Sequence, residues 1–326
     1  MTVRRLRILI PGGTGQLGLI LARHFHEHGH SVSVIARHPR PSEWPTLTWT
    51  GHDLGPWANS IDGADVVINL AGRSVDCRYN ATHRREILNS RTISTGLVGQ
   101  AIAGCARPPR LWLNASTATI YRHSLDRPMD EGGEIGGSEP DAPGAWAFSI
   151  DVATAWENAF FSAATPGTRR VALRTAIVMS PDRGGAFDKL LRLVRFGLGG
   201  PVASGKQYVS WIHETDFIRA IEFLIDKDDF EGPVNICSPC PIWNHRFMRC
   251  LRQAWCTTYI GMPVPAWLLS LGAVYLRAEP ELVLKSRYVV PGRLLNAGFD
   301  FHFPDWRGAA QDLVQRWRAV REEPTT

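Results

Sequence analysis

The chain has 326 residues, of which 44% are hydrophobic, enough for one large domain or two unequal ones. Its net charge is +5, but the basic clusters are short and lie beside carboxylates or inside apolar patterns, so we expect no nucleic-acid partner. No signal peptide or membrane-length apolar run is visible, which predicts a cytoplasmic location and no membrane span. The six cysteines fit no common zinc spacing, so we expect buried thiols and no metal site.

The most informative segment is 8–25. A short apolar run precedes four closely spaced glycines, and an apolar helix-like stretch and a second strand over 31–35 follow them. Such glycines let a strand turn sharply into a helix, and they let the backbone approach a pyrophosphate that the helix N-terminus attracts. The alternative is a glycine-rich turn that binds nothing. We predict a dinucleotide-binding turn with contacts from Gly12, Thr14, Gly15, Gln16, Leu17 and Gly18.

The end of the second strand favours NADP(H) over NAD(H). A site that prefers NAD usually has an Asp or Glu here, which binds the ribose 2′-hydroxyl. This chain has Arg37 instead, and no carboxylate occurs before Glu43. We expect Arg37 to pair with the 2′-phosphate of NADP(H), and the alternative is a solvated surface arginine.

Strands and helices alternate through the first half of the chain. The predicted strands span 64–70, 110–115 and 170–179, and the predicted helices span 86–103 and 148–164. This order predicts an α/β fold, a doubly wound parallel sheet of the Rossmann type with helices on both faces. After Pro181 the pattern loosens, and it predicts a helix over 186–196, an extended stretch over 208–212, a helix over 214–226 and a strand over 233–237.

The same pattern suggests a division of the chain. We expect residues 1–181 to form an NADP-binding Rossmann domain, to which residues 214–237 return. Residues 182–213 and 238–326 would form a smaller C-terminal lobe on the substrate side. Ligands of doubly wound folds bind beyond the carboxyl ends of the strands, so this lobe would close over the cofactor.

These residues resemble the short-chain dehydrogenase/reductase superfamily, in its extended, epimerase-like branch. Pro11-Gly12-x-x-Gly15-x-x-Gly18 matches the fingerprint of that branch, with Pro11 where Thr is usual. The segment 115–121 is similar to the Ser-Ser-x-x-Val-Tyr segment of nucleotide-sugar epimerases, which implies that Thr117 is the catalytic Ser/Thr. The resemblance also implies cofactor contacts near the adenine and after the fourth strand, from Asp53, Leu54, Leu70, Ala71 and Gly72.

More narrowly, the chain resembles atypical epimerase family proteins that carry a C-terminal domain of unknown function. Some of these proteins are labelled as cell-division inhibitors. The likeness runs from about residue 7 to 313, and its most specific stretches are 69–80, 90–91, 210–216 and 285–287. It implies a fold and a cofactor more than a reaction.

The pattern breaks at the family's Tyr and Lys, which lie four residues apart on one helix face. That Tyr shuttles a proton, while the Lys lowers the pKa of the Tyr and holds the nicotinamide ribose. The best match here is Phe148 and Val152, and a shift by one residue gives Ser149 and Ala153. Phe and Val cannot transfer a proton, so the standard mechanism is absent.

Three substitutes for the missing pair are candidates: Thr117 with Tyr121, the loop 77–80, and His213. The competing interpretations are a core tyrosine with a bonded hydroxyl, a loop that packs the lid, and a histidine tied to Asp216. We predict that Thr117 and Tyr121 transfer the proton. Arg78, from the loop, would stabilise a developing oxyanion.

The substrate position also departs from the family. Nucleotide-sugar epimerases have an Arg that grips the sugar-nucleotide diphosphate where this chain has Val209, and Lys206 and Arg287 remain candidates for that contact. We therefore predict an NADP(H)-binding, epimerase- or oxidoreductase-like protein for a small carbonyl or sugar-like substrate, as a monomer or homodimer. The alternatives are a catalytically silent NADP(H)-binding sensor or regulator and, last, membrane-surface docking through 267–275.

Overall fold

The computed structural model of the chain describes residues 4–137, 139, 143, 146–256, 261–262 and 281–322. Its main body is a seven-stranded parallel sheet in the order β10-β6-β5-β4-β1-β2-β3. The strands are β1 (Arg7–Pro11), β2 (Ser31–Ala36), β3 (Thr46–Thr48), β4 (Val66–Asn69), β5 (Leu111–Thr117), β6 (Arg169–Thr175) and β10 (Gly232–Ile236).

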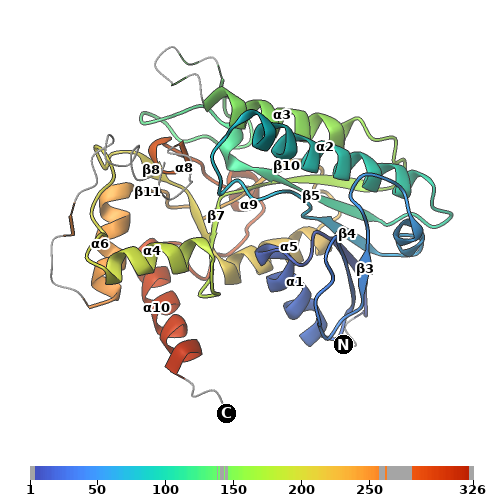
Figure 1. Cartoon of the computed structure of the whole chain (residues 1–326), viewed down its shortest axis with the longest axis horizontal. Coiled ribbons are helices and arrows are strands. Elements are labelled where there is room, and N and C mark those ends of the chain that lie inside the picture. The colour runs from blue at the N-terminus through green and yellow to red at the C-terminus, as the bar shows by residue number, and fades with distance from the viewer. Residues whose placement is uncertain are drawn as a thin grey trace.

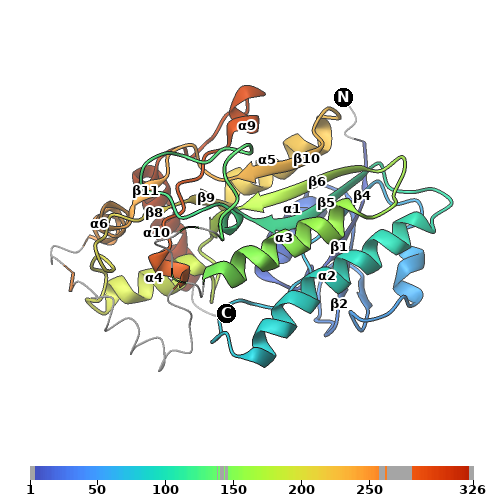
Figure 2. The same cartoon turned by 90° about the horizontal axis from the view of Figure 1, so that it is seen from above.

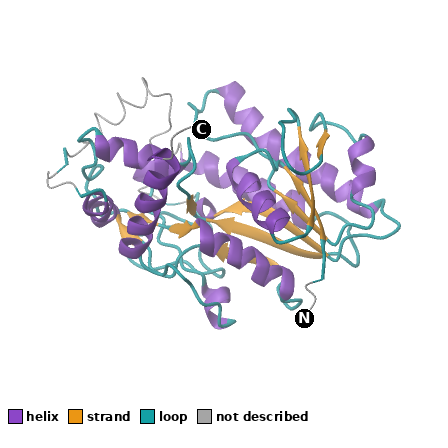
Figure 3. Cartoon of the chain, turned by 90° about the horizontal axis from the view of Figure 1, so that it is seen from below, coloured by secondary structure: helices purple, strands orange, loops and turns teal. Residues whose placement is uncertain are grey.

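Helices cover both faces of this sheet (Figure 1). Helices α2 (Ala81–Ala103) and α3 (Ala147–Phe161) lie on one face, and α1 (Gln16–Glu27) and α5 (Glu214–Asp226) lie on the other. Figure 3 shows the strands enclosed between these two layers. The predicted doubly wound α/β fold is therefore confirmed.

The strands read as nearly continuous apolar runs because both of their faces are buried. Ile8 and Ile10 of β1 belong to the apolar cluster beneath α1 and α5, while Leu9 between them belongs to the cluster beneath α2 and α3. In β5, Trp112 faces the α2–α3 side and packs edge-on against Phe160 of α3, with 4.6 Å between the ring centroids.

A smaller lobe is built around a third apolar cluster at one end of the sheet (Figure 2). Within it, the rings of Phe247 and Trp306 stack at 4.0 Å. Its longer helices are α4 (Ala186–Arg195), α6 (Asn244–Ala254) and α10 (Trp306–Glu322). Its short strands are β7 (Ile177–Met179), β8 (Tyr208–Val209), β9 (Trp211–His213) and β11 (Ile242–Trp243). The remaining short helices are η1 (Pro56–Ser60), η2 (Ala118–Ile120), α8 (Glu281–Leu284) and α9 (Gly292–Asn296).

The predicted strand over 170–179 is wrong in its extent, because the chain changes sheets at Ala176. The Ala176 amide donates to the carbonyl of Ile236 in the large sheet at 3.0 Å, whereas the Ile177 amide donates to Ser210 at 3.4 Å. Strand β7 then pairs with β9 in the lobe. The helix predicted from residue 86 begins earlier, because the Asn80 side chain caps it by accepting from the His83 amide at 2.8 Å.

The cysteines are less buried than the sequence predicted. Cys237 is buried, Cys77, Cys105 and Cys250 are half-buried, and Cys240 and Cys256 are exposed, so the expectation of buried thiols is confirmed only for Cys237. The described residues contain no cluster of His, Cys, Asp and Glu that could hold a metal ion.

None of the described helices combines the length and apolar character that a membrane crossing needs. The segment 267–275 lies outside the described residues.

Candidate functional site

The glycine turn between β1 and α1 uses its glycines in two different ways. Gly12 has a φ of +79°, and a Cβ there would lie 2.6 Å from the Ala71 amide nitrogen. A Cβ on Gly18 would lie 2.4 Å from the Cα of Gly13. These two glycines therefore permit close backbone packing. A Cβ on Gly15 would meet only the Gly12 carbonyl oxygen, at 3.4 Å. The space beside Gly15 is therefore not filled by protein atoms and is open to a ligand.

The first turn of α1 presents unsatisfied donors to this space. Gly15 is its N-cap in an extended conformation and provides no side-chain cap, and the turn holds no acidic residue. The amide nitrogen Nε2 of Gln16 is buried and has no hydrogen-bond partner among the described residues. A buried donor of this kind fits a site that a polar ligand completes.

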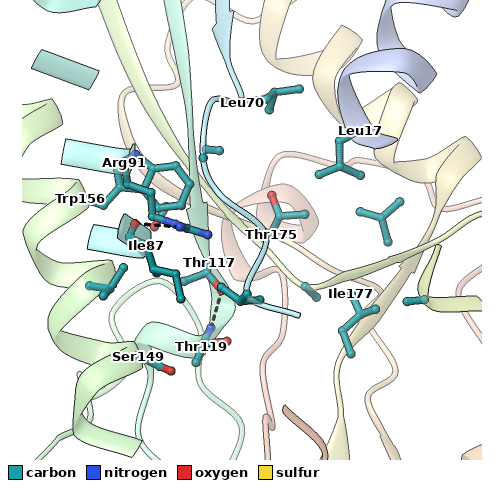
Figure 4. A pocket seen from close by; sticks show the side chains of 18 of the residues that line it. Leu17, Leu70, Ile87, Arg91, Thr117, Thr119, Ser149, Trp156, Thr175 and Ile177 are labelled. Atoms are coloured by element: carbon teal, nitrogen blue, oxygen red, sulfur yellow. Dashed lines mark hydrogen bonds between the residues drawn. The ribbon is translucent and has the colours of Figure 1, made fainter. Parts of the chain in front are cut away.

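A cavity of about 380 Å³ opens beside this turn, at the carboxyl ends of the central strands (Figure 4). Its walls come from the turn after β4, the end of β5, the helices α2 and α3, and the segment where the chain enters the lobe. Among its lining residues are Gln16, Leu17, Leu70, Gly72, Tyr79, Ile87, Arg91, Thr117, Thr119, Phe148, Ser149, Val152, Trp156, Thr175 and Ile177.

The structure brings several of the predicted cofactor residues together here. Gln16, Leu17, Leu70, Gly72 and Thr117 line the cavity. The Leu70 amide donates to the Pro11 carbonyl at 2.8 Å, which joins the turn after β4 to the glycine turn. The Thr117 Oγ1 accepts from the Thr119 amide at 3.1 Å, so its own hydrogen remains available to donate toward the cavity.

The predicted contacts for the far end of a dinucleotide lie outside this cavity. Arg37 is exposed directly after β2, and Gly51 of the following loop lies beside its side chain. In that loop Asp53 accepts from the Thr50 hydroxyl at 2.5 Å, and Leu54 is 49% exposed. Arg37 follows β2, and Asp53 and Leu54 follow β3. They therefore lie at the carboxyl edge of the sheet, on the side of the glycine turn that is away from the lobe.

Tyr121 does not lie where the sequence suggested. Its side chain is 1% exposed and does not line the cavity. Its hydroxyl donates to Asn235 Oδ1 at 2.7 Å and accepts from Arg174 Nη1 at 2.9 Å, and Arg174 in turn forms a buried ion pair with Glu157. Burial raises the pKa of Tyr121 to about 12. The structure thus supports a core tyrosine with a bonded hydroxyl and contradicts the placement of Tyr121 at the site.

The loop 77–80 contributes a different residue from the one predicted. Arg78 is exposed and lies outside the cavity, and its carbonyl accepts from the Asn80 amide at 3.0 Å. Tyr79 lines the cavity instead, and its ring packs edge-on against Phe148 with 5.2 Å between centroids. The loop therefore brings a phenol, rather than a guanidinium, to the cavity beside Phe148 of α3.

His213 is a structural residue. It is fully buried, its Nδ1 accepts from the Thr215 amide at 3.1 Å as the N-cap of α5, and its ring stacks on Phe303. Its Nε2 lies 3.0 Å from Asp312, not Asp216, which corrects the expected partner. Burial lowers the pKa of His213 to about 4.

Arg91 is a cavity residue that the sequence reasoning assigned no role. It lies on α2, its Nη1 donates to the Ile87 carbonyl at 3.0 Å, and its guanidinium lies 5.0 Å from the ring of Trp156. Burial lowers the pKa of Arg91 to about 10, and the nearby Tyr79 opposes this shift. The pair Ser90-Arg91 carried part of the family likeness, but only the fold shows that this side chain reaches the cavity.

Comparison with known proteins places this architecture in a family. Residues 8–237 match the model of the NAD dependent epimerase/dehydratase family, and residues 264–313 match a domain of unknown function, DUF1731. The mouse epimerase family protein SDR39U1 is 32% identical over 320 residues, which cover 95% of this chain and 100% of that protein. The Staphylococcus epidermidis epimerase family protein SERP0438 is 30% identical over 311 residues, with 95% and 99% covered.

A solved structure agrees with these relatives. The crystal structure of human epimerase family protein SDR39U1 (isoform 2) with NADPH superposes with a TM-score of 0.83 at 29% identity, covering 95% of this chain and 99% of that one. The family model spans most of the chain, and the mouse relative matches nearly all of it. The resemblance seen in the motifs is thereby confirmed, and the chain belongs to the NAD dependent epimerase/dehydratase family.

Proposed function

We propose that this chain binds NADP(H) along the carboxyl edge of its sheet and transfers hydride between that cofactor and a small carbonyl or sugar-like substrate in the cavity. One observation carries the proposal: a single cavity is lined both by Gln16 and Leu17 of the glycine turn and by Thr117 and Tyr79, whose side chains carry hydroxyl groups. The human relative that was crystallised with NADPH supports the choice of cofactor, as does Arg37 after β2.

The residues present fit such a cofactor. The open space at Gly15 and the buried, unbonded Gln16 Nε2 suit a pyrophosphate at the start of α1. Arg37 suits a 2′-phosphate, and the exposed Leu54 suits an apolar base face. When bound, the nicotinamide would supply or accept the hydride.

Within the cavity, Tyr79 is the best-placed group to move a proton to or from a substrate oxygen. Tyr79 interacts electrostatically with both Arg91 and Arg287, and this interaction opposes the lowering of their pKa by burial. Thr117 would hold the substrate oxygen by donating its remaining hydrogen.

A second function is supported by one observation. Helix α3 presents Phe148 and Val152 to the cavity where the family has Tyr and Lys, as expected of an NADP(H)-binding regulator without catalysis. Single-turnover oxidation of bound NADPH, measured against a panel of aldehydes and ketones, separates the two. Oxidation that depends on the carbonyl supports the enzyme. Tight NADPH binding with no oxidation by any carbonyl would favour the regulator, and absence of NADPH binding would overturn both.

A further inference from the structure

The main cavity contains a cation without a counter-charge. Among the described residues that line the cavity, Arg91 alone carries a charge. It lies near the middle of α2, and Figure 4 shows its guanidinium pointing into the cavity. Burial lowers the pKa of Arg91, and no described carboxylate acts on it. Because arginines are rarely buried without a partner and burial disfavours the charged form, an anion in the cavity would stabilise this side chain.

The protein positions the guanidinium through contacts that leave its charge in place. Its Nη1 donates to the Ile87 carbonyl, one turn earlier in the same helix, and its face lies 5.0 Å from the ring of Trp156. A guanidinium has five N–H donors, and only one of them is used among the described residues. The others remain available to a ligand, and their planar fork suits two oxygens of one carboxylate or phosphate group.

Arg91 lies where the cofactor turn and α3 come together. A Cβ on Gly72 would lie 3.5 Å from the Arg91 Cζ, so the guanidinium lies beside the turn after β4, which is hydrogen-bonded to the glycine turn. On its other side, Trp156 follows Val152 by one turn of α3. Val152 is the best sequence match to the lysine of the family, and it lines the same cavity. Helix α2 therefore brings a cation to a cavity wall to which α3 contributes apolar side chains.

We propose that Arg91 is the anion-binding residue of this cavity and pairs with two oxygens of a carboxylate or phosphate group. Two molecules could supply that group: NADP(H), through its pyrophosphate, or the substrate, which would then be a carbonyl compound that bears an acidic group. The inference rests on the proposed function only in naming these two sources. The position of Arg91 between the cofactor turn and α3 is compatible with each of them.

The test uses the full chain and two titrations at pH 7. NADPH is titrated into the ligand-free protein by fluorescence, and malonate is titrated into the NADPH-saturated protein by calorimetry, with malonamide as a neutral control of similar shape. Arg91→Met is compared with the wild type and with Arg85→Met, which removes an exposed arginine of α2 from outside the cavity. We expect Arg91→Met to bind at least one of NADPH and malonate about tenfold more weakly, the scale of a charge-assisted contact, while Arg85→Met binds as the wild type does.

The two titrations separate the two sources. Weaker NADPH binding by Arg91→Met assigns the contact to the cofactor. Weaker binding of malonate, but not of malonamide, with NADPH binding unchanged assigns it to an acidic group of the substrate. Unchanged NADPH affinity together with malonate binding that is equal or absent in both proteins would overturn the inference, as would an equal loss for malonamide.

Two further measurements keep the test decisive. Thermal melts without ligand show whether Arg91→Met is folded, and Arg91→Gln, which removes the charge but keeps a polar side chain, replaces it if it is not. If the wild type binds no NADPH, the proposed function fails. Malonate binding to the ligand-free wild type and Arg91→Met then still decides whether Arg91 binds an anion, because equal or absent binding would exclude it.

Discussion

The ring of Tyr79 packs edge-on against the ring of Phe148, with an interplanar angle of 70°. Phe148 is the best sequence match to the helix position of the family's tyrosine, and both residues line the same cavity. A loop has therefore placed a phenol beside the position where the helix lacks one. If Tyr79 has taken over proton transfer, the loss of the helical tyrosine does not imply the loss of the reaction.

The first prediction tests this exchange of roles. Tyr79→Phe removes the hydroxyl and keeps the ring that contacts Phe148, so NADPH affinity should stay the same. The rate of carbonyl-dependent NADPH oxidation should fall by about 10²–10⁴, the usual contribution of a general acid. Single-turnover kinetics on any carbonyl that supports oxidation would measure it.

Tyr121→Phe is the matched control, because it removes a phenolic hydroxyl from the core. It should leave the oxidation rate unchanged and lower the free energy of unfolding by about 1–3 kcal/mol, since Asn235 and Arg174 each lose a buried hydrogen bond. The reverse pattern, a slow but stable Tyr121→Phe and an active Tyr79→Phe, would restore the assignment made from the sequence.

The contrast between these tyrosines shows what could be predicted from the sequence. The doubly wound sheet and the glycine turn are local patterns, and the helix over 214–226 has the bounds that its sequence predicted. The burial of Tyr121 depends on Asn235 and Arg174, which lie 114 and 53 residues away in the chain. No local pattern reveals such contacts.

The same reason explains the other departures. The predicted strand breaks at Ala176 because two adjacent amides pair with different sheets. The Ala176 amide donates to the large sheet, and the Ile177 amide donates to Ser210, which lies far along the chain. Lys285 reaches Thr119 across 166 residues. A motif search therefore finds the cofactor turn, whose residues are neighbours in sequence, and misses the cavity wall, whose residues meet only in the fold.

The second prediction concerns the glycine turn. Gly15→Val should abolish NADPH binding and leave the melting temperature nearly unchanged, because the new side chain enters open space that the cofactor would fill. Gly18→Val should lower the melting temperature itself, since its Cβ would lie 2.4 Å from the Gly13 backbone. Fluorescence titration with NADPH and thermal melts of both variants would check the pair. Undiminished NADPH binding by a folded Gly15→Val protein would show that the turn is not the cofactor site.

The third prediction concerns the choice of cofactor. Arg37→Ala should weaken NADPH binding by roughly 1–3 kcal/mol, the scale of a hydrogen bond to a charged group, and leave NADH binding nearly unchanged. Arg40→Ala removes an exposed charge from the same loop and serves as the control for general electrostatic attraction. Parallel titrations with NADPH and NADH would measure both variants. An equal loss for the two cofactors would exclude a contact between Arg37 and the 2′-phosphate.

The fourth prediction concerns the stability of the lobe at acid pH and follows from His213. Burial holds this imidazole neutral in the folded protein, with a pKa of about 4 against an ordinary value of 6.5. Asp312 and Asp216 favour its protonation and Arg316 opposes it, but burial dominates. Between pH 6.5 and 4 the unfolded chain therefore binds more protons at this position than the folded one does.

The free energy of unfolding should accordingly fall as the pH drops from 6.5 to 4. Below pH 4, His213 should cause no further loss of stability. The contribution of His213 should be on the order of 1–3 kcal/mol. His213→Asn keeps an N-cap for α5 and removes the titrating group, so it should start less stable through the lost stacking on Phe303 and show a shallower decline. Urea denaturation of both proteins at several pH values between 4 and 7 gives the two slopes. Because all other titrating groups, including Glu214 beside Arg316, are shared, identical slopes would mean that His213 is not held neutral in the core.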